Sequence, residues 1–132
     1  MNDDVVVRFA AWVDRILDSR NLSQVVAYNF NLYEHTDETA IQLIGATSYD
    51  PNNDDWACDA YFTSGEDLFT LPHSLTGENW EDAQGFAIRL IEDYLQRSTL
   101  PVPLKTCRAV TVGFVDGSLQ AVLPATGRIT NR

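Results

Sequence analysis

The chain contains few of the residues that cross-link small secreted domains or carry reactive chemistry. It has two cysteines, Cys58 and Cys107, and only two histidines among 132 residues. Two cysteines are too few for a disulfide framework, and the sequence does not imply a bridge between them. The cysteines and histidines also lack the spacing of a zinc site. We therefore expect no metal or other cofactor.

Long apolar runs are missing as well. No stretch of about 18 apolar residues occurs, so no membrane-spanning helix is predicted. The first four residues include Asp3 and Asp4, where a secretory signal would carry basic residues, and Arg8 soon interrupts the apolar run that follows. These features predict a cytoplasmic protein with reduced thiols and no membrane contact.

Basic residues are scarce and unevenly placed. The chain has 19 acidic residues against 9 Lys and Arg, for a formal net charge of −10. Residues 34–93 hold fourteen carboxylates and one basic residue, Arg89, a net −13, whereas residues 94–132 carry +4. Negative charge opposes binding to nucleic acids and anionic membranes. The uneven distribution favours a basic protein partner, although a surface that is acidic only for solubility explains part of it equally well.

Two segments have the periodicity of amphipathic helices. Apolar residues recur at three- and four-residue spacing from Val5 to Leu17, and again from Trp80 to Tyr94. Both stripes include a tryptophan, Trp12 and Trp80, which we place in the core. Pro101 and Pro103 prevent the second helix from continuing.

The remaining segments favour strands. Residues 26–33 alternate apolar and polar side chains, and residues 39–47 read as the strand that returns beside them. Residues 56–62 are predicted to form a third strand and residues 68–71 a short edge strand. Residues 106–123 form a hairpin around Asp116-Gly117, a strong turn signal. The tail from Pro124 is predicted to fray.

This order of elements predicts a single α+β domain spanning residues 1–132. We expect an antiparallel sheet of about five to six strands, with two helices packed on one face. A chain of this length buries enough surface to form one core without cross-links.

Catalytic motifs are absent from the sequence, so an enzyme is not predicted. His35 and His73 read as solvated loop histidines, and Cys58 as a buried strand cysteine. Two alternatives remain open. One is a small enzyme or ligand-binding domain, and the other is an adaptor subunit of a larger complex. The first would need a pocket between sheet and helices, lined by Tyr28, Phe30, Tyr61 and Tyr94.

The densest acidic segment surrounds Pro51 in a predicted loop. The candidate partner-binding residues are Asp50, Asp54, Asp55, Trp56, Asp59, Glu66 and Asp67. Carboxylates on loops can pair with the Arg and Lys of a basic partner, and a central aromatic residue can anchor the contact. Trp56 is equally readable as a core residue.

The same segment permits two other interpretations. Asp50, Asn52 and Asp54 match the opening of a calcium-binding EF-hand loop, but Asp55 stands where that loop needs glycine and Tyr61 where it needs glutamate. The other interpretation is a pair of carboxylates for general acid–base catalysis, as in glycosidases.

The stretch Ser48-Tyr49-Asp50-Pro51-Asn52-Asn53-Asp54-Asp55-Trp56-Ala57-Cys58-Asp59 resembles the acidic segment of small immunity proteins from bacterial toxin systems, including contact-dependent inhibition. The likeness is one of size, charge and layout. It implies an inhibitor that covers the active site of a basic toxin domain, often a nuclease. No residue roles carry over, since no defined motif is shared.

Overall fold

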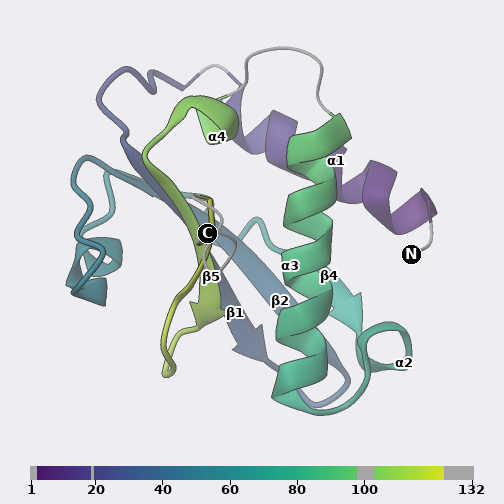
Figure 1. Ribbon diagram of the computed structural model, residues 1–132. Helices are drawn as coiled ribbons and strands as arrows, with labels where there is room; N and C mark the ends of the chain where they lie inside the picture. Colours follow the sequence, from purple (N-terminus) through teal and green to yellow (C-terminus); the bar gives the residue numbers. More distant parts are fainter. Residues whose placement is uncertain (1–2, 19, 98–102, 124–132) are drawn as a thin grey trace, which may run out of the picture.

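The computed structural model describes residues 3–18, 20–97 and 103–123. In chain order the elements are α1 (Asp3–Leu17), β1 (Ala27–Glu34), β2 (Glu38–Ala46), the 3-10 helix η1 (Asp54–Cys58), β3 (Phe62–Thr63), β4 (Phe69–Pro72), α2 (His73–Thr76), α3 (Trp80–Arg97), α4 (Pro103–Thr106), β5 (Ala109–Phe114) and β6 (Gln120–Leu123). The predicted α+β fold is confirmed: a mixed, mostly antiparallel sheet packs against helices (Figure 1).

Both long helices lie on the same face of the sheet. Alternate residues of β1, namely Tyr28, Phe30 and Leu32, are at most 1% exposed and belong to one core cluster with the apolar stripes of α1 and α3. Aromatic rings join the layers, because Phe9 of α1 contacts Phe30 and Phe69 with centroid distances of 5.7 and 5.3 Å. The predicted layer of two helices on one sheet face is therefore correct.

The sheet has six strands, and one of its pairings is parallel. The order is β3-β2-β1-β5-β6, with β4 also paired to β2. β1 and β5 run parallel from the pair Ala27–Ala109 to the pair Leu32–Phe114. The predicted antiparallel sheet did not include this parallel pairing, which arises because α3 carries the chain back along one face before β5 begins. The predicted hairpin is present: β5 and β6 are antiparallel, and the Gly117 amide donates to the Phe114 carbonyl at 2.9 Å.

The prediction of a strand over residues 56–62 was wrong for most of its length. Residues 54–58 form η1, because Asn53 has extended backbone angles and its side chain accepts from the Asp55 amide at 2.9 Å, an N-cap. Only Phe62 and Thr63 pair with β2, and β4 pairs farther along the same edge of β2. The segment between β3 and β4 leaves the sheet, which turns Asp67 towards α1.

Two short helices were not predicted. α2 follows the edge strand β4, and α4 precedes β5. The described part of α3 extends to Arg97, and Pro103 is the first residue of α4. Pro101 itself and the tail from Pro124 lie outside the described residues.

The exposed position of Trp80 is also a correction. Trp80 is 54% exposed, whereas Trp12 is 4% exposed as predicted. Trp80 is the first residue of α3, where the helix has only just begun, so its side chain extends beyond the end of the buried stripe.

Candidate binding surface

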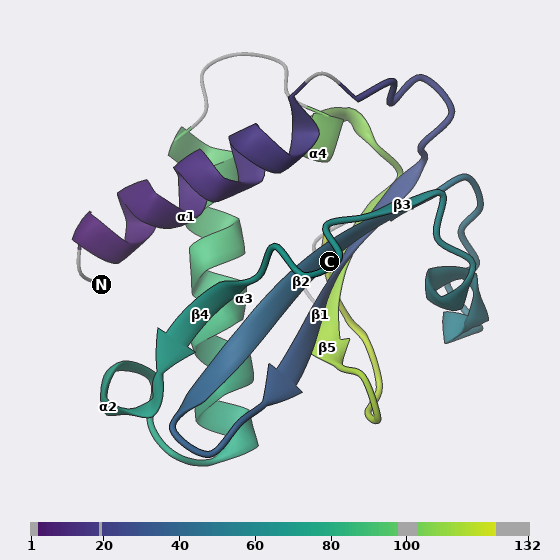
Figure 2. The ribbon, with the colours of Figure 1, turned by 180° about the vertical axis from the view of Figure 1, so that it is seen from behind.

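The loop between β2 and β3 carries the predicted aspartates on the side of the molecule away from the long helices. We call residues 49–61, which include η1, the acidic loop. Asp50, Asp54, Asp55 and Asp59 are all exposed. In both views the ribbon of η1 stands clear of α1 and α3 (Figures 1 and 2). The structure therefore gathers these four carboxylates on one projecting segment.

A buried tryptophan anchors this loop. Trp56 is 6% exposed and packs on Ala27, Ala46 and Ala109, each fully buried, in a cluster separate from the main core. Its indole meets the ring of Tyr49 edge-on, with centroids 5.2 Å apart. Three alanines at the ends of neighbouring strands leave the space that a large ring needs. Trp56 thus lies beneath the candidate surface, not on it.

Hydrogen bonds fix the loop backbone around this anchor. The Asn52 amide donates to Asp50 Oδ1 at 2.9 Å, and the Asp55 amide donates to Asn53 Oδ1 at the same distance. Asp54 Oδ2 accepts from the Leu119 amide at 3.1 Å, which ties η1 to the β5–β6 connection. These bonds fix the loop backbone, and those to Asp50 and Asp54 each use one carboxylate oxygen and leave the other.

The exposed aromatic residue of the acidic loop is Tyr61. It is 51% exposed, and its amide donates to the Gly45 carbonyl at 2.7 Å. Tyr61 directly precedes the buried Phe62 of β3, so strand alternation turns its ring outward. This alternation is visible in the sequence, and it could have indicated that Tyr61 is the exposed aromatic residue of the loop and Trp56 is not.

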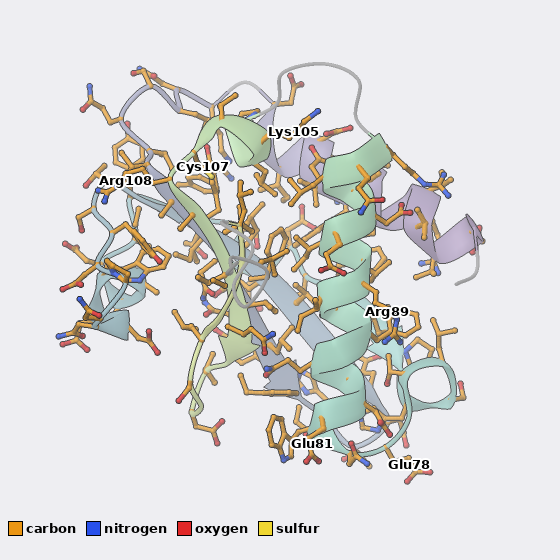
Figure 3. All side chains as sticks on the ribbon, in the orientation of Figure 1. Glu78, Glu81, Arg89, Lys105, Cys107 and Arg108 are labelled. Atoms are coloured by element: carbon orange, nitrogen blue, oxygen red, sulfur yellow. The ribbon has the colours of Figure 1, made fainter. Side chains whose placement is uncertain are left out.

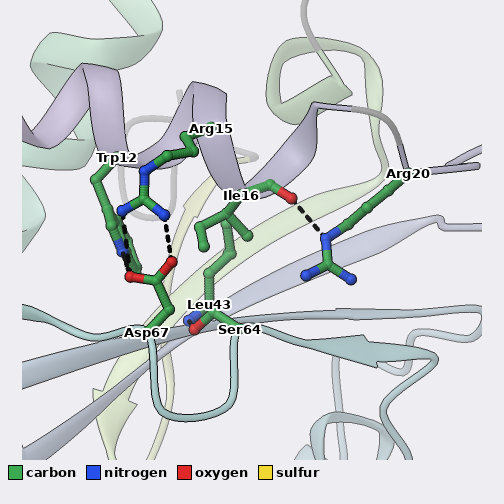
Figure 4. A network of polar contacts seen from close by, with 7 residues as sticks. All are labelled: Trp12, Arg15, Ile16, Arg20, Leu43, Ser64 and Asp67. Carbon is green, nitrogen blue, oxygen red and sulfur yellow. Dashed lines mark hydrogen bonds and ion pairs between the residues drawn. The ribbon is translucent and has the colours of Figure 1, made fainter.

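Glu66 and Asp67 are not part of this surface. Glu66 is exposed in the β3–β4 connection, and Asp67 is bound to α1 (Figure 4). Asp67 forms an ion pair with Arg15, and Trp12 Nε1 donates to Asp67 Oδ1 at 3.2 Å. The hydrogen bond from Arg15 holds the pKa of Asp67 below its usual value. Of the seven predicted residues, the structure therefore brings together the four aspartates, with Trp56 under them.

The reactive side chains are dispersed. His35 is exposed in the β1–β2 turn, and His73 Nε2 lies 3.5 Å from Thr39 Oγ1. Both cysteines are free, and Cys58 is exposed on η1, so the prediction of a buried strand cysteine was wrong. Burial raises the pKa of the Cys107 thiol to about 11. No group of three or more His, Cys, Asp and Glu suited to a metal ion occurs in the described part of the chain, so the EF-hand interpretation gains no support.

The residues that the ligand-binding alternative would place around a pocket between sheet and helices do not form one. Tyr28, Phe30 and Tyr94 are 1%, 0% and 4% exposed and belong to the solid core. Burial, reinforced by a hydrogen bond from the Tyr94 hydroxyl to Asp14 Oδ1 at 2.6 Å, raises the pKa of Tyr94. The fourth residue, Tyr61, lies outside the core. A ligand site lined by these four rings is thereby ruled out.

A polar ladder that sequence reasoning missed crosses the sheet face opposite the helices. Thr111 Oγ1 donates to Asn29 Oδ1 at 2.7 Å, and Asn29 Nδ2 donates to Asn31 Oδ1 at 2.6 Å. Asn31 Nδ2 and Gln42 Nε2 continue the chain to Gln42 Oε1 and the Gly65 carbonyl. Asn29 is fully buried, so its bonds matter for stability. Asn29, Asn31 and Gln42 of this ladder line a hollow of about 360 Å³ beside the acidic loop.

Comparisons of the chain with protein-family models, with curated proteins and with solved structures find no match. Within the described residues, no helix is both long enough and apolar enough to cross a membrane.

Proposed function

We propose that this chain is a protein-binding domain that holds a basic partner through the acidic loop. The observation that supports the proposal is that one loop exposes four aspartates while its own tryptophan is buried and anchors the loop. A surface fixed before binding loses little conformational entropy when a partner docks. Complementary charge then accelerates encounter, most strongly at low salt.

Tyr61 supplies the contact that the carboxylates lack. Tyrosine is enriched among the residues that dominate binding energy, because it buries a large ring while its hydroxyl keeps a polar partner. Tyr61 stands two residues after Asp59 on the same loop. The proposed interface therefore has an aromatic residue beside a charged rim.

The specific form of the proposal is an immunity-type inhibitor. A basic toxin domain, such as a nuclease with a cationic active site, has the charge that the acidic loop complements. Binding over that site would exclude an anionic substrate. This form additionally requires that a gene beside the one for this chain encodes such a toxin.

The test is binding to the purified products of the neighbouring genes, measured by biolayer interferometry at 50 and 300 mM NaCl. Two charge-matched variants are compared: Asp54→Asn/Asp55→Asn/Asp59→Asn in the acidic loop, and Asp18→Asn/Asp37→Asn/Glu78→Gln elsewhere, all exposed. We expect the loop variant to lower the association rate about tenfold and the other variant to change it little. Tyr61→Ala should chiefly accelerate dissociation.

Equal effects of the two triple variants would contradict the proposal, since net charge alone would then explain binding. If a basic partner binds but its gene causes no toxicity in growing cells, the inhibitor form fails and the binding form stands.

A further inference from the structure

A second, larger hollow opens where the parallel strands β1 and β5 end. It measures about 860 Å³ and is bordered by the ends of these strands, the first residues of α3 and the β5–β6 turn. Because β1 and β5 are parallel, their carboxyl ends reach the same edge of the sheet, the lower edge in Figure 1. We call this hollow the edge cleft. Its volume is in the range of sites that hold small molecules or short peptide segments.

Exposed apolar surface concentrates in the edge cleft. Within the described residues, four large apolar side chains are exposed, and two of them, Trp80 at 54% and Val115 at 55%, line this cleft. Tyr33 also borders the cleft, and its hydroxyl donates to Gln42 Oε1 at 3.0 Å. The exposed indole of Trp80 provides a π face for a ligand to stack on.

The charge of the edge cleft is negative. Glu34 and Asp116 line it, both exposed, and neither forms an ion pair with another described residue. Glu78 and Glu81 lie at the same end of the molecule, whereas Lys105 and Arg108 lie at the opposite end (Figure 3). A ligand entering the cleft therefore meets uncompensated carboxylates and an indole face, the combination that attracts organic cations.

The start of α3 does not convert the cleft into an anion site. A helix amino terminus carries positive partial charge. Here Asn79 Oδ1 accepts from the Asp82 amide at 2.8 Å, and Glu81 and Asp82 stand in the first turn. The capping side chain and the two carboxylates offset the helix dipole.

We propose that the edge cleft binds the guanidinium group of an arginine side chain carried by a peptide segment. The guanidinium would stack on Trp80 and donate hydrogen bonds to Glu34 and Asp116. Arginine fits better than lysine because its planar group can stack on an aromatic face and donate to carboxylates simultaneously. The cleft is larger than one side chain, so it has room for the residues that flank the arginine. This site stands independently of the acidic loop.

The test is a titration followed by ¹H–¹⁵N NMR at pH 8 and low salt, with the indole N–H of Trp80 as the reporter. The probes are acetyl-Gly-Arg-Gly-amide, the same peptide with lysine, and the same peptide with citrulline, which keeps the planar shape of arginine without its charge. Propylguanidinium, which carries the same single charge, tests whether a small guanidinium compound suffices without a peptide. We expect binding in the order arginine, lysine, citrulline, with propylguanidinium weaker than the arginine peptide.

Three variants locate the site. Trp80→Leu lacks the indole reporter, so its titration is followed through the backbone amides of Glu34 and Asp116, and it should lower affinity for the arginine peptide about tenfold. Glu34→Gln and Asp116→Asn should each lower it about threefold. Asn keeps the turn-forming chemistry of the Asp116-Gly117 pair, and the other two positions are exposed, so all three variants should fold. Asp55→Asn reports on the acidic loop, and Asp18→Asn, at an exposed position outside both sites, is the matched control that should leave this affinity unchanged.

Equal binding of the arginine and citrulline peptides would overturn the proposal, as would tighter binding of an acetyl-Gly-Glu-Gly-amide control. Loss of arginine binding in Asp55→Asn, with none in Trp80→Leu, would place the cation on the acidic loop and equally overturn it. Propylguanidinium binding as tightly as the peptide would overturn the peptide component.

Discussion

Asp67 is the acidic side chain that joins the sheet edge to α1. Its carboxylate accepts from the guanidinium of Arg15 and from the indole of Trp12 (Figure 4). The aspartates of the acidic loop make no ion pair with any described residue, although Asp50 and Asp54 accept from backbone amides. An acidic residue is available to a partner only when its own chain has not already bound it, and at Asp67 the chain has.

The lowered pKa of Asp67 predicts a pH-dependent contribution to stability. Its folded pKa lies below its unfolded value, so the stabilisation is present above the unfolded pKa, near 4, and is lost as pH falls through the folded pKa. We expect Asp67→Asn to be less stable than the parent at pH 7 and the difference to shrink as pH falls through the lowered pKa of Asp67. Urea unfolding across this pH range measures it.

Asp67→Ala serves as the comparison, because it removes the acceptor for Trp12 as well as the charge. It should retain a deficit at low pH that Asp67→Asn does not show. A pH-independent difference between Asp67→Asn and the parent would mean that the ion pair with Arg15 contributes nothing.

Trp56 and Trp80 show what limits prediction of single residues. The neighbours of each residue in the sequence suggest the environment that it does not have. Trp56 stands among aspartates but is 6% exposed, and Trp80 stands on an apolar stripe but is 54% exposed. Trp56 is buried because three alanines from separate strands meet beneath it. That meeting depends on the parallel β1–β5 pairing, a long-range contact that local patterns do not encode.

At the scale of elements, periodicity was sufficient wherever one face of an element is buried. α1, α3, β1, β2 and the β5–β6 hairpin all follow from apolar spacing or turn chemistry. The strand predicted over residues 56–62 was wrong for most of its length, where aromatic and apolar residues suggested a strand and η1 covers residues 54–58. There the Asn53 cap, a local polar contact, decides the structure. The edge cleft was also beyond prediction, because three separate elements form it.

Gly113 of β5 allows two backbone segments to touch, and its replacement tests that contact. A methyl group on Gly113 would lie 2.6 Å from the Ser118 carbonyl oxygen and 3.2 Å from Leu119 Cα. We expect Gly113→Ala to reduce the free energy of unfolding by about 1–3 kcal/mol, because backbone must move to admit the group. Chemical denaturation measures the change.

Gly85 in α3 is the matched control for this substitution. A methyl group there would meet nothing closer than the Arg89 guanidinium at 3.8 Å. Gly85→Ala should therefore raise stability by about 0.5–1 kcal/mol, through helix propensity. If both variants lower the free energy of unfolding equally, the close approach of the backbone segments at Gly113 is not the cause of the destabilisation.

At the scale of the whole molecule, acidic groups occupy two sites on either side of the β5–β6 turn. The acidic loop is tied to the segment after this turn through Asp54 and Leu119, and the edge cleft includes Asp116 of the turn itself. Lys105 and Arg108 lie far from the edge cleft (Figure 3), but the Arg108 guanidinium lies against the acidic loop, 5.6 Å from the centroid of the Tyr49 ring. Among the described residues, the edge-cleft end of the molecule is therefore the one suited to cationic ligands.

This arrangement predicts that salt stabilises the folded chain. With a net charge of −10, repulsion among carboxylates opposes compaction, and added salt screens that repulsion. We expect the urea midpoint to rise between 10 and 300 mM NaCl.

The Asp54→Asn/Asp55→Asn/Asp59→Asn variant should be more stable than the parent at 10 mM NaCl and respond less to salt, because its deleted charges were adjacent. The charge-matched Asp18→Asn/Asp37→Asn/Glu78→Gln variant removes separated charges and should fall between the two. A midpoint that falls with salt would mean that attractive pairs such as Arg15–Asp67 outweigh the repulsion among carboxylates. Repulsion within the acidic loop would then not be available for a basic partner to relieve.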